Sequence, residues 1–242
     1  MGRPTRLGMI VPSSNTCLEP QTYRILGDRE DVTVHFTRIE VTRIALDGDA
    51  DSQFDHSTML NAAELLRTAD VDVIAWNGTA GSWLGTEHDR NMVERITQAT
   101  GVPATTSTLA YLDTFTQFGL TRVGLVSPYT GDVNAAIIER YAAEGIRVVG
   151  EHHLGLDVNE SFARVRPEEL LLPSLELADG GGPGAPEALI YLCTNLYGAP
   201  IVEHVEAQTG LAALDSVAVT LWRCLNMAGL PGLASRWGRL LI

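Results

Sequence analysis

The chain carries one apolar pattern twice, first as Thr5-Arg6-Leu7-Gly8-Met9-Ile10-Val11-Pro12-Ser13 and again as Thr121-Arg122-Val123-Gly124-Leu125-Val126-Ser127-Pro128-Tyr129. Two further echoes pair residues 72–79 with 187–194, and residues 100–107 with 209–216. Offsets of about 109 to 116 residues indicate a duplicated unit, because solenoid repeats have much shorter periods. We therefore expect two similar units that face each other across a cleft.

The order of the expected elements indicates the fold class. Short apolar runs predict buried strands at 7–11, 32–41, 71–76, 123–126, 146–149 and 189–192. Helices are expected at 57–69, 87–100, 108–118, 132–144, 167–178, 200–209 and 217–228. Alternating strands and helices predict parallel sheets with right-handed crossovers. The sequence thus predicts an α/β protein of two similar doubly wound parallel-sheet domains, related by pseudo-twofold symmetry, with the site in the cleft between them.

The composition excludes several classes of function. All 17 basic residues are arginine, so Schiff-base chemistry, pyridoxal phosphate enzymes and the P-loop lysine are excluded. The net charge of −13 argues against a nucleic-acid partner, because phosphate binding needs a basic surface. The six histidines show no metal-ligand spacing, so neither a metal nor another cofactor is expected.

The lengths of the apolar runs and the number of cysteines indicate the cellular compartment of the protein. No run is long enough to span a bilayer, and no apolar stretch follows the N-terminal arginines as in a secretory signal. Three cysteines do not form a disulfide framework. We therefore expect a cytoplasmic protein without a membrane partner. The sequence is compatible with a homo-oligomer and does not fix the oligomeric state.

Polar loops follow four of the expected strands. They comprise residues 12–16, 77–82, 127–131 and 193–195, and each is rich in hydroxyls, amides and small side chains. Ligands of open parallel sheets bind beyond the carboxyl ends of the strands, and such loops suit a carboxylate. Ordinary caps and turns use the same residue types. The repetition of these loops at matched positions of the repeat favours a binding site.

Cys193 is the one cysteine at the end of an expected strand, and the repeat places Gly78 opposite it in the first half. A thiol at a helix N-terminus has a lowered pKa and can act as acid, base or nucleophile, which is what we expect of Cys193. The alternative is a buried structural cysteine. Cys17 lies one turn past the first loop, and Cys224 is expected in the core of the last helix.

These motifs resemble a known enzyme family. The stretch from Gly8 to Thr16 is similar to the opening of maleate cis-trans isomerases and arylmalonate decarboxylases, within the aspartate/glutamate racemase superfamily. Tyr129 resembles their tyrosine loop in the second domain, Asn159 resembles a binding asparagine of the isomerases, and Cys193-Thr194-Asn195 matches the second catalytic cysteine. The resemblance also assigns the last helix to the first unit. The domains are then residues 1–112 with 217–242, and residues 113–216.

One departure from the isomerase pattern decides which reaction the resemblance implies. Isomerases and racemases of this kind carry a cysteine in each half, whereas this chain has Gly78 at the first position, as arylmalonate decarboxylases do. The resemblance implies a cofactor-independent lyase that decarboxylates a malonate-like dicarboxylate, with Cys193 protonating the enediolate. The alternatives are a maleate isomerase or racemase acting on a small dicarboxylate, and a non-catalytic dicarboxylate-binding protein. The substrate-binding residues expected are Ser14, Asn15, Gly78, Thr79, Tyr129, Asn159 and Thr194.

Overall fold

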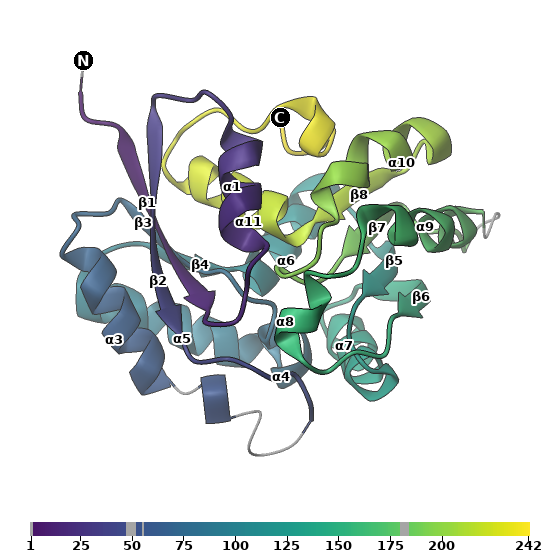
Figure 1. Cartoon of the computed structure of the whole chain (residues 1–242), viewed down its shortest axis with the longest axis horizontal. Helices are drawn as coiled ribbons and strands as arrows, with labels where there is room; N and C mark the ends of the chain where they lie inside the picture. Colours follow the sequence, from purple (N-terminus) through teal and green to yellow (C-terminus); the bar gives the residue numbers. More distant parts are fainter. Residues whose placement is uncertain (1, 47–51, 55, 180–183) are drawn as a thin grey trace.

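The computed structural model describes residues 2–46, 52–54, 56–179 and 184–242, and these contain two parallel sheets of four strands each. The first sheet has the order β2-β1-β3-β4, and the second has the order β6-β5-β7-β8. The identical orders confirm the predicted α/β class with two similar units, which lie beside each other in Figure 1. The strands are β1 (Thr5–Pro12), β2 (Val32–Ile39), β3 (Val73–Trp76), β4 (Ala104–Thr106), β5 (Arg122–Ser127), β6 (Arg147–His153), β7 (Ala188–Tyr191) and β8 (Ala212–Asp215).

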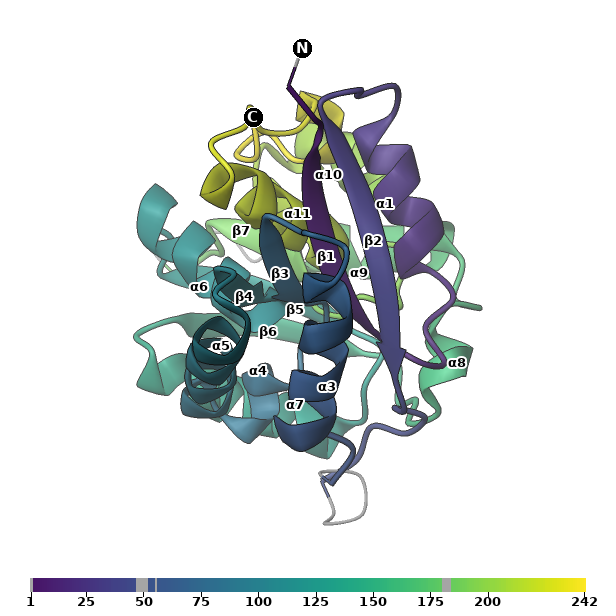
Figure 2. The same ribbon diagram turned by 90° about the vertical axis from the view of Figure 1, so that its left-hand side faces the viewer.

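Helices connect these strands as the alternating pattern predicted. In the first half they are α1 (Leu18–Leu26), η1 (Ser52–Phe54), α3 (His56–Arg67), α4 (Gly81–Leu84), α5 (Thr86–Thr100) and α6 (Ser107–Phe118). In the second half they are α7 (Gly131–Ala143), α8 (Asn159–Phe162), η2 (Pro167–Leu170), α9 (Leu171–Ala178), η3 (Ala199–Ile201), α10 (Val202–Thr209), α11 (Ser216–Met227) and η4 (Ser235–Trp237). Around the first sheet, α3 and α5 lie on one face and α1 and α11 on the other (Figure 2).

Equivalent caps start the helices that follow the last strand of each sheet. The Thr106 hydroxyl accepts the amide of Leu109 at the start of α6. The Asp215 carboxylate accepts the amides of Val217 and Ala218 at the start of α11. Burial raises the pKa of Asp215 to about 7, against backbone N–H groups that favour its ionised form. Side-chain oxygens that accept from the first turn are the usual N-caps, so the duplication extends to local polar detail.

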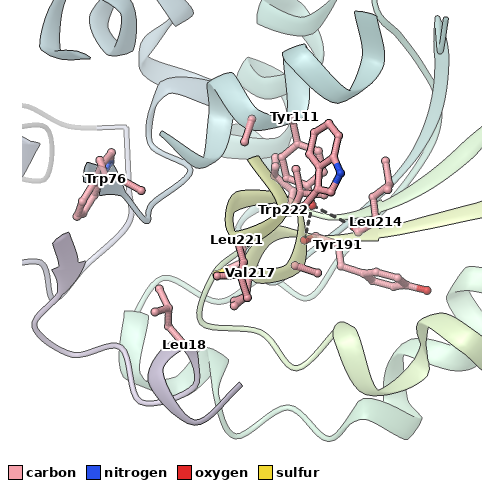
Figure 3. Close-up of a cluster of buried hydrophobic side chains, with 14 of the residues drawn as sticks. Leu18, Trp76, Tyr111, Tyr191, Leu214, Val217, Leu221 and Trp222 are labelled. Atoms are coloured by element: carbon pink, nitrogen blue, oxygen red, sulfur yellow. Dashed lines mark hydrogen bonds between the residues drawn. The ribbon is translucent and has the colours of Figure 1, made fainter. Parts of the chain in front are cut away.

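The core joins the two halves without a break. The buried hydroxyl of Tyr111 on α6 donates to the carbonyl of Tyr191 and lies equally close to that of Leu214, both at 3.0 Å (Figure 3). α11 packs against α6, α1 and β3 of the first half and also against β8. The buried apolar side chains form one continuous cluster. The domain boundaries at 112 and 216 stay predictions.

The strand registers place the starts of the polar loops at the carboxyl ends of the central strands. Ile10 of β1 pairs with Trp76 of β3, and Val126 of β5 pairs with Tyr191 of β7. The chain therefore leaves each central pair of strands at matched positions, and the four polar loops begin there. Loops of one half contact those of the other, through hydrogen bonds between Asn15 and Thr194 and between Thr79 and Tyr129.

Candidate active site

A small, partly open cavity lies where the ends of β1, β3, β5 and β7 meet. Its free volume of about 20 Å³ suffices for about one water molecule. Two larger hollows, of about 420 and 520 Å³, lie elsewhere on the molecule and contain none of the predicted site residues. The cavity is lined by Pro12, Val41, Ile44, Phe54, Trp76, Gly78, Thr79, Ala80, Trp83, Tyr129, Asn159, Cys193 and Thr194.

Cys193 is buried in the wall of this cavity and follows β7 by two residues. The amide of Asn195 donates to its sulfur at 3.3 Å. Burial raises the pKa of the Cys193 thiol to about 12, although the Tyr129 hydroxyl and the Asn195 amide favour the thiolate. The lowered pKa predicted from the sequence was therefore wrong, because desolvation outweighs these donors and a turn, not a helix, follows Cys193. At neutral pH the group is a protonated thiol.

Thr79 and Tyr129 form a hydroxyl pair across the cleft, with their oxygens 2.7 Å apart. Burial raises the pKa of Tyr129 well above its ordinary value, so its proton is retained. The Tyr129 hydroxyl also interacts with the Cys193 thiol, so the Thr79–Tyr129 pair and Cys193 form one group of adjacent polar atoms at the cavity. The rings of Trp83 and Phe162 pack edge-on against Tyr129, with centroids at 5.3 and 5.6 Å, and hold its hydroxyl in place.

Backbone amides add further donors to the same wall. Within the described part of the chain, no acceptor takes a hydrogen bond from the amide N–H groups of Thr79, Ala80 or Thr194. The hydroxyl of Thr194 differs, because it donates to the carbonyl of Asn77 at 3.1 Å and accepts from Asn15 at 3.2 Å. Thr194 therefore offers a ligand its amide, while its side chain is engaged in the protein.

The loop of residues 12–16 holds neighbouring segments of the cavity wall through hydrogen bonds. The Ser14 hydroxyl donates to the carbonyl of Val41 at 2.6 Å and accepts from the Asn159 amide group at 2.8 Å. The Asn15 side chain caps α1 by accepting from the amides of Cys17 and Leu18. Of these predicted binding residues only Asn159 lines the cavity, so Ser14 and Asn15 position their neighbours.

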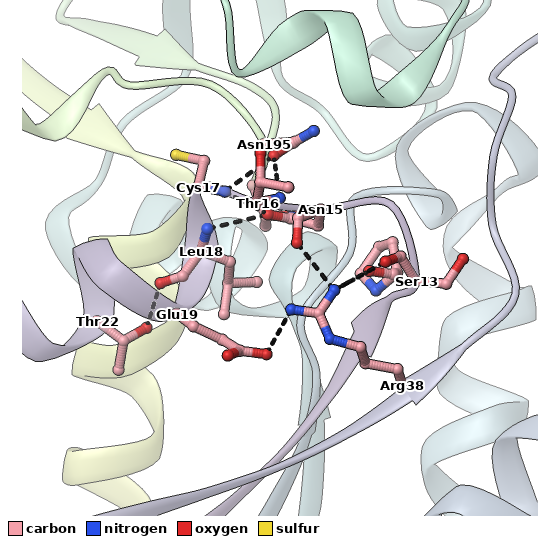
Figure 4. A network of polar contacts seen from close by, with 11 residues as sticks. Ser13, Asn15, Thr16, Cys17, Leu18, Glu19, Thr22, Arg38 and Asn195 are labelled. Atoms are coloured by element: carbon pink, nitrogen blue, oxygen red, sulfur yellow. Dashed lines mark hydrogen bonds and ion pairs between the residues drawn. The ribbon is translucent and has the colours of Figure 1, made fainter.

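Asn195 is a residue that the sequence analysis did not assign to the site. Its Oδ1 atom accepts from the amides of Thr16 and Cys17 at 3.0 and 3.1 Å (Figure 4). Its Nδ2 atom donates to the carbonyl of Asn159 at 2.6 Å. Arg38 completes this support by donating to the carbonyls of Ser13 and Asn15. The position of Asn195 next to Thr194 in a strand-end motif was the signal available in the sequence.

Gly78 lines the cavity together with Cys193, as the repeat predicted. A Cβ atom on Gly78 would lie 2.4 Å from Cζ2 and 2.5 Å from Cε2 of Trp76, which is closer than carbon atoms pack. The indole of Trp76 thus occupies the space that a side chain at position 78 would need. Among the described cavity-lining residues, Cys193 is the only thiol and none is charged.

Comparison with known proteins identifies the family. The family model described as arylmalonate decarboxylase matches residues 7–241. The chain belongs to this family. It is 25% identical to maleate isomerase of Pseudomonas putida over 253 residues, which cover 98% of this chain and 96% of that protein. It is 26% identical to arylmalonate decarboxylase of Bordetella bronchiseptica over 226 residues, with 92% and 90% covered.

A solved structure supports the same relationship. The maleate isomerase Iso from Pseudomonas putida S16 matches with a TM-score of 0.87 at 25% identity, and 98% of each chain is covered. The resemblance read from the strand-end motifs is therefore confirmed. The family contains decarboxylases, which are lyases, and isomerases. Membership alone does not select between these two reactions for the present chain.

The other two cysteines lie outside the cavity lining. Cys17 is buried, and the Gln21 amide donates to its sulfur at 2.9 Å. Cys224 is buried in α11, where burial raises its pKa to about 12. Within the described ranges no group of three His, Cys, Asp or Glu side chains is placed to hold a metal ion. None of the described helices is long and apolar enough to cross a membrane.

Proposed function

We propose that this chain is a cofactor-independent decarboxylase of a malonate-like dicarboxylate and that Cys193 is its proton donor. One observation carries the proposal. The cavity contains a single thiol, Cys193, and the indole of Trp76 occupies the space that a side chain at Gly78 would need. A thiol that is protonated at neutral pH is suited to deliver a proton. It delivers that proton to one face of the substrate only.

The proposed reaction begins with one carboxylate bound at the hydroxyl pair. The hydroxyls of Thr79 and Tyr129 and the amides of Thr79, Ala80 and Thr194 are the donors. The second carboxylate faces side chains without charge, where loss of its own charge is favoured. The bond between that carboxylate and the α-carbon breaks, and carbon dioxide leaves. The electron pair passes into the retained carboxylate to form an enediolate.

Protonation completes the cycle. The Cys193 thiol transfers its proton to the α-carbon, and the resulting thiolate takes a proton from water. The donors that bind the retained carboxylate now face an enediolate with more negative charge on its oxygens, so they act as an oxyanion hole. No charged side chain lines the cavity among the described residues. Stabilisation of the enediolate therefore depends on oriented N–H and O–H dipoles.

A second candidate reaction is the isomerisation of maleate. It is favoured by Asn159, which lines the cavity, and by the maleate isomerase of Pseudomonas putida as a relative over nearly the whole chain. The isomerase pattern uses a thiol in each half. Here the first-half position is Gly78 beneath Trp76, so an isomerase would need another group in that role. This makes decarboxylation the better-supported proposal.

A substrate screen tests the proposal. Purified protein is incubated in D₂O with phenylmalonate, methylphenylmalonate, methylmalonate, maleate and aspartate, and each reaction is followed by ¹H NMR. We expect carbon dioxide release from a malonate, with one deuterium at the α-carbon and a single enantiomer from methylphenylmalonate. Conversion of maleate to fumarate without malonate turnover would favour the isomerase. Saturable binding without turnover would identify a binding protein, and both results would overturn the proposal.

A further inference from the structure

We propose that the indole N–H groups of Trp76 and Trp83 bind the retained carboxylate of the substrate and that the Trp76 ring shields its second face. This inference rests on the proposed function, because it assigns two further binding residues to the same site. It goes beyond the hydroxyls and amides at the strand ends. Neither tryptophan follows from the family motifs quoted above.

The observation that carries it is an unused pair of buried donors. Trp76 and Trp83 both line the cavity, and their side chains are 1% and 4% exposed. Neither Nε1 atom has a hydrogen-bond partner within the described part of the chain. A buried donor without an acceptor costs free energy, and nearly all buried polar groups in proteins are paired. Two such donors in the wall of one cavity indicate that a ligand supplies the acceptors.

The geometry places the Trp76 donor beside the reacting groups. Its Nε1 atom lies 3.0 Å from the position of a Cβ on Gly78, and Gly78 lines the same cavity as Cys193. Thr79, which follows Gly78, belongs to the hydroxyl pair with Tyr129. The donor is therefore next to the expected carboxylate site. In Figure 3, Trp76 lies apart from the interior cluster around Trp222.

Aromatic packing fixes both indoles. The ring of Phe54 stands edge-on to Trp76 and to Trp83, with centroids 6.3 and 6.0 Å away. Trp83 in turn packs edge-on against Tyr129 at 5.3 Å. Such edge-to-face pairs have preferred geometries. The two donors are thus held at the cavity by the same aromatic cluster that holds the Tyr129 hydroxyl.

The chemistry of indole determines what these groups do. An indole N–H donates a hydrogen bond and neither accepts one nor transfers its proton in proteins. It stabilises a carboxylate or an enediolate without competing with Cys193 as the acid. The ring of Trp76 also fills the space beside Gly78, the position that the repeat pairs with Cys193. Water is thereby kept from the second face, and only small substituents fit beside the ring.

The direct test observes the indole protons. The protein contains four tryptophans, so ¹H–¹⁵N spectra of ¹⁵N-tryptophan protein should show four indole signals, which Trp→Phe variants assign. Methylmalonate is titrated into the Cys193→Ser protein to avoid turnover. We expect the signals of Trp76 and Trp83 to shift downfield with saturation. Those of Trp222 and Trp237 should stay in place.

Two variants give a second readout. Trp76→Phe removes the donor and keeps a ring, and we expect the Kd of the Cys193→Ser protein for methylmalonate to rise roughly tenfold or more, as for a lost bond to a charged group. Trp237→Phe is the matched control. Its Nε1 is also buried and has no partner among the described residues, but Trp237 belongs to η4 and does not line the cavity. In the active protein, Trp76→Leu should lower the optical purity of the product from methylphenylmalonate.

The outcomes separate this inference from the proposed function. A second titration uses uniformly ¹⁵N-labelled protein. If backbone amides of Thr79 and Thr194 shift in it while both indole signals stay in place, the inference is wrong and the proposed function stands. A Trp76→Phe variant that binds as tightly as its parent would also overturn the inference. If no dicarboxylate of the screen shifts any signal, the proposed function itself fails.

Discussion

The hydroxyl oxygens of Thr79 and Tyr129 lie 2.7 Å apart, although 50 residues separate them in the chain. Thr79 follows β3 of the first sheet, and Tyr129 follows β5 of the second. The duplicated topology brings these strand ends face to face, and the pair spans the cavity that contains Cys193. The contact therefore links the repeat seen in the sequence to the chemistry proposed for the site.

This pair predicts non-additive kinetics. Thr79→Val and Tyr129→Phe each remove a donor that faces the enediolate, and we expect each to lower kcat/KM roughly tenfold to a thousandfold, as for oxyanion-hole donors. Because the hydroxyls depend on each other, the double variant should lose less than the product of the two single effects. A double-mutant cycle on the decarboxylation rate measures this coupling. Strictly multiplicative effects would show that the pair does not act as a unit.

The raised pKa of Cys193 predicts the pH dependence of activity. The active form is the protonated thiol, which persists as pH rises past the ordinary thiol value of about 9 and is lost only near pH 12. The rate should therefore show no thiol limb below about pH 10. Iodoacetamide should also label native Cys193 far more slowly than the unfolded protein at pH 8, because the thiolate is the nucleophile. An alkaline limb below pH 9 that disappears in the Cys193→Ser variant would contradict this account.

The hydrogen bonds of Asn195 predict that its replacement lowers the stability of the folded protein. Asn195→Ala removes the acceptor of the Thr16 amide and one of the two acceptors of the Cys17 amide, and Asn195 is buried. We expect the free energy of unfolding to fall by about 2 to 4 kcal/mol, since buried groups lose their partners. Asn226→Ala, at an exposed position on α11, should change it by less than about 0.5 kcal/mol. Urea denaturation measures both, and equal small effects would show that Asn195 does not tie the loops together.

The contact between Gly78 and Trp76 predicts that the effect of Gly78→Cys depends on the side chain at position 76. Gly78→Cys alone places its Cβ 2.4 Å from the Trp76 ring, and overpacking of this kind costs roughly 1 to 3 kcal/mol. In a Trp76→Leu background the added cysteine should cost little further stability, because the ring that it would meet is gone, and the second face should be open to a thiol. We then expect the product from methylphenylmalonate to become less optically pure. Thermal denaturation and chiral chromatography measure the two effects.

A Gly78→Cys protein that is as stable as the wild type would show that the Trp76 ring moves away at little cost. The Trp76→Leu single variant is the control, because it opens the cavity without adding a thiol. If the double variant folds and its product stays as pure as that of this control, position 78 does not reach the reacting carbon.

The repeat and the strand-end motifs were sufficient to predict the two sheets and the meeting of Cys193, Gly78, Thr79 and Tyr129 at one cavity. The short strands β4 and β8 and the helices α1, α4 and α8 were missed, because segments of three or four residues show no periodicity and α1 is mostly polar. These elements form only because the longer strands provide a surface on which they pack.

The local electrostatics could not be predicted in the same way. The pKa of Cys193 depends on burial by residues far away in the sequence, and a motif does not report burial. The position of the Trp76 indole over Gly78 likewise depends on how the side chains pack in the folded protein, which the sequence motifs do not report. Asn15 and Asn195 look alike as strand-end asparagines, yet Asn15 caps α1 and donates to the Thr194 side chain, whereas Asn195 accepts from backbone amides of the first half.

The most direct test of the account is the turnover number of Cys193→Ser on the malonate that the screen identifies, compared with wild type and with Cys224→Ala. Serine keeps the approximate size of the side chain but is a far weaker acid, so loss of the general acid should slow turnover by roughly a thousandfold or more. Cys224→Ala should stay within roughly tenfold of wild type, since Cys224 lies in the core of α11. A Cys193→Ser protein that decarboxylates at a near-normal rate would contradict the claim that Cys193 protonates the enediolate.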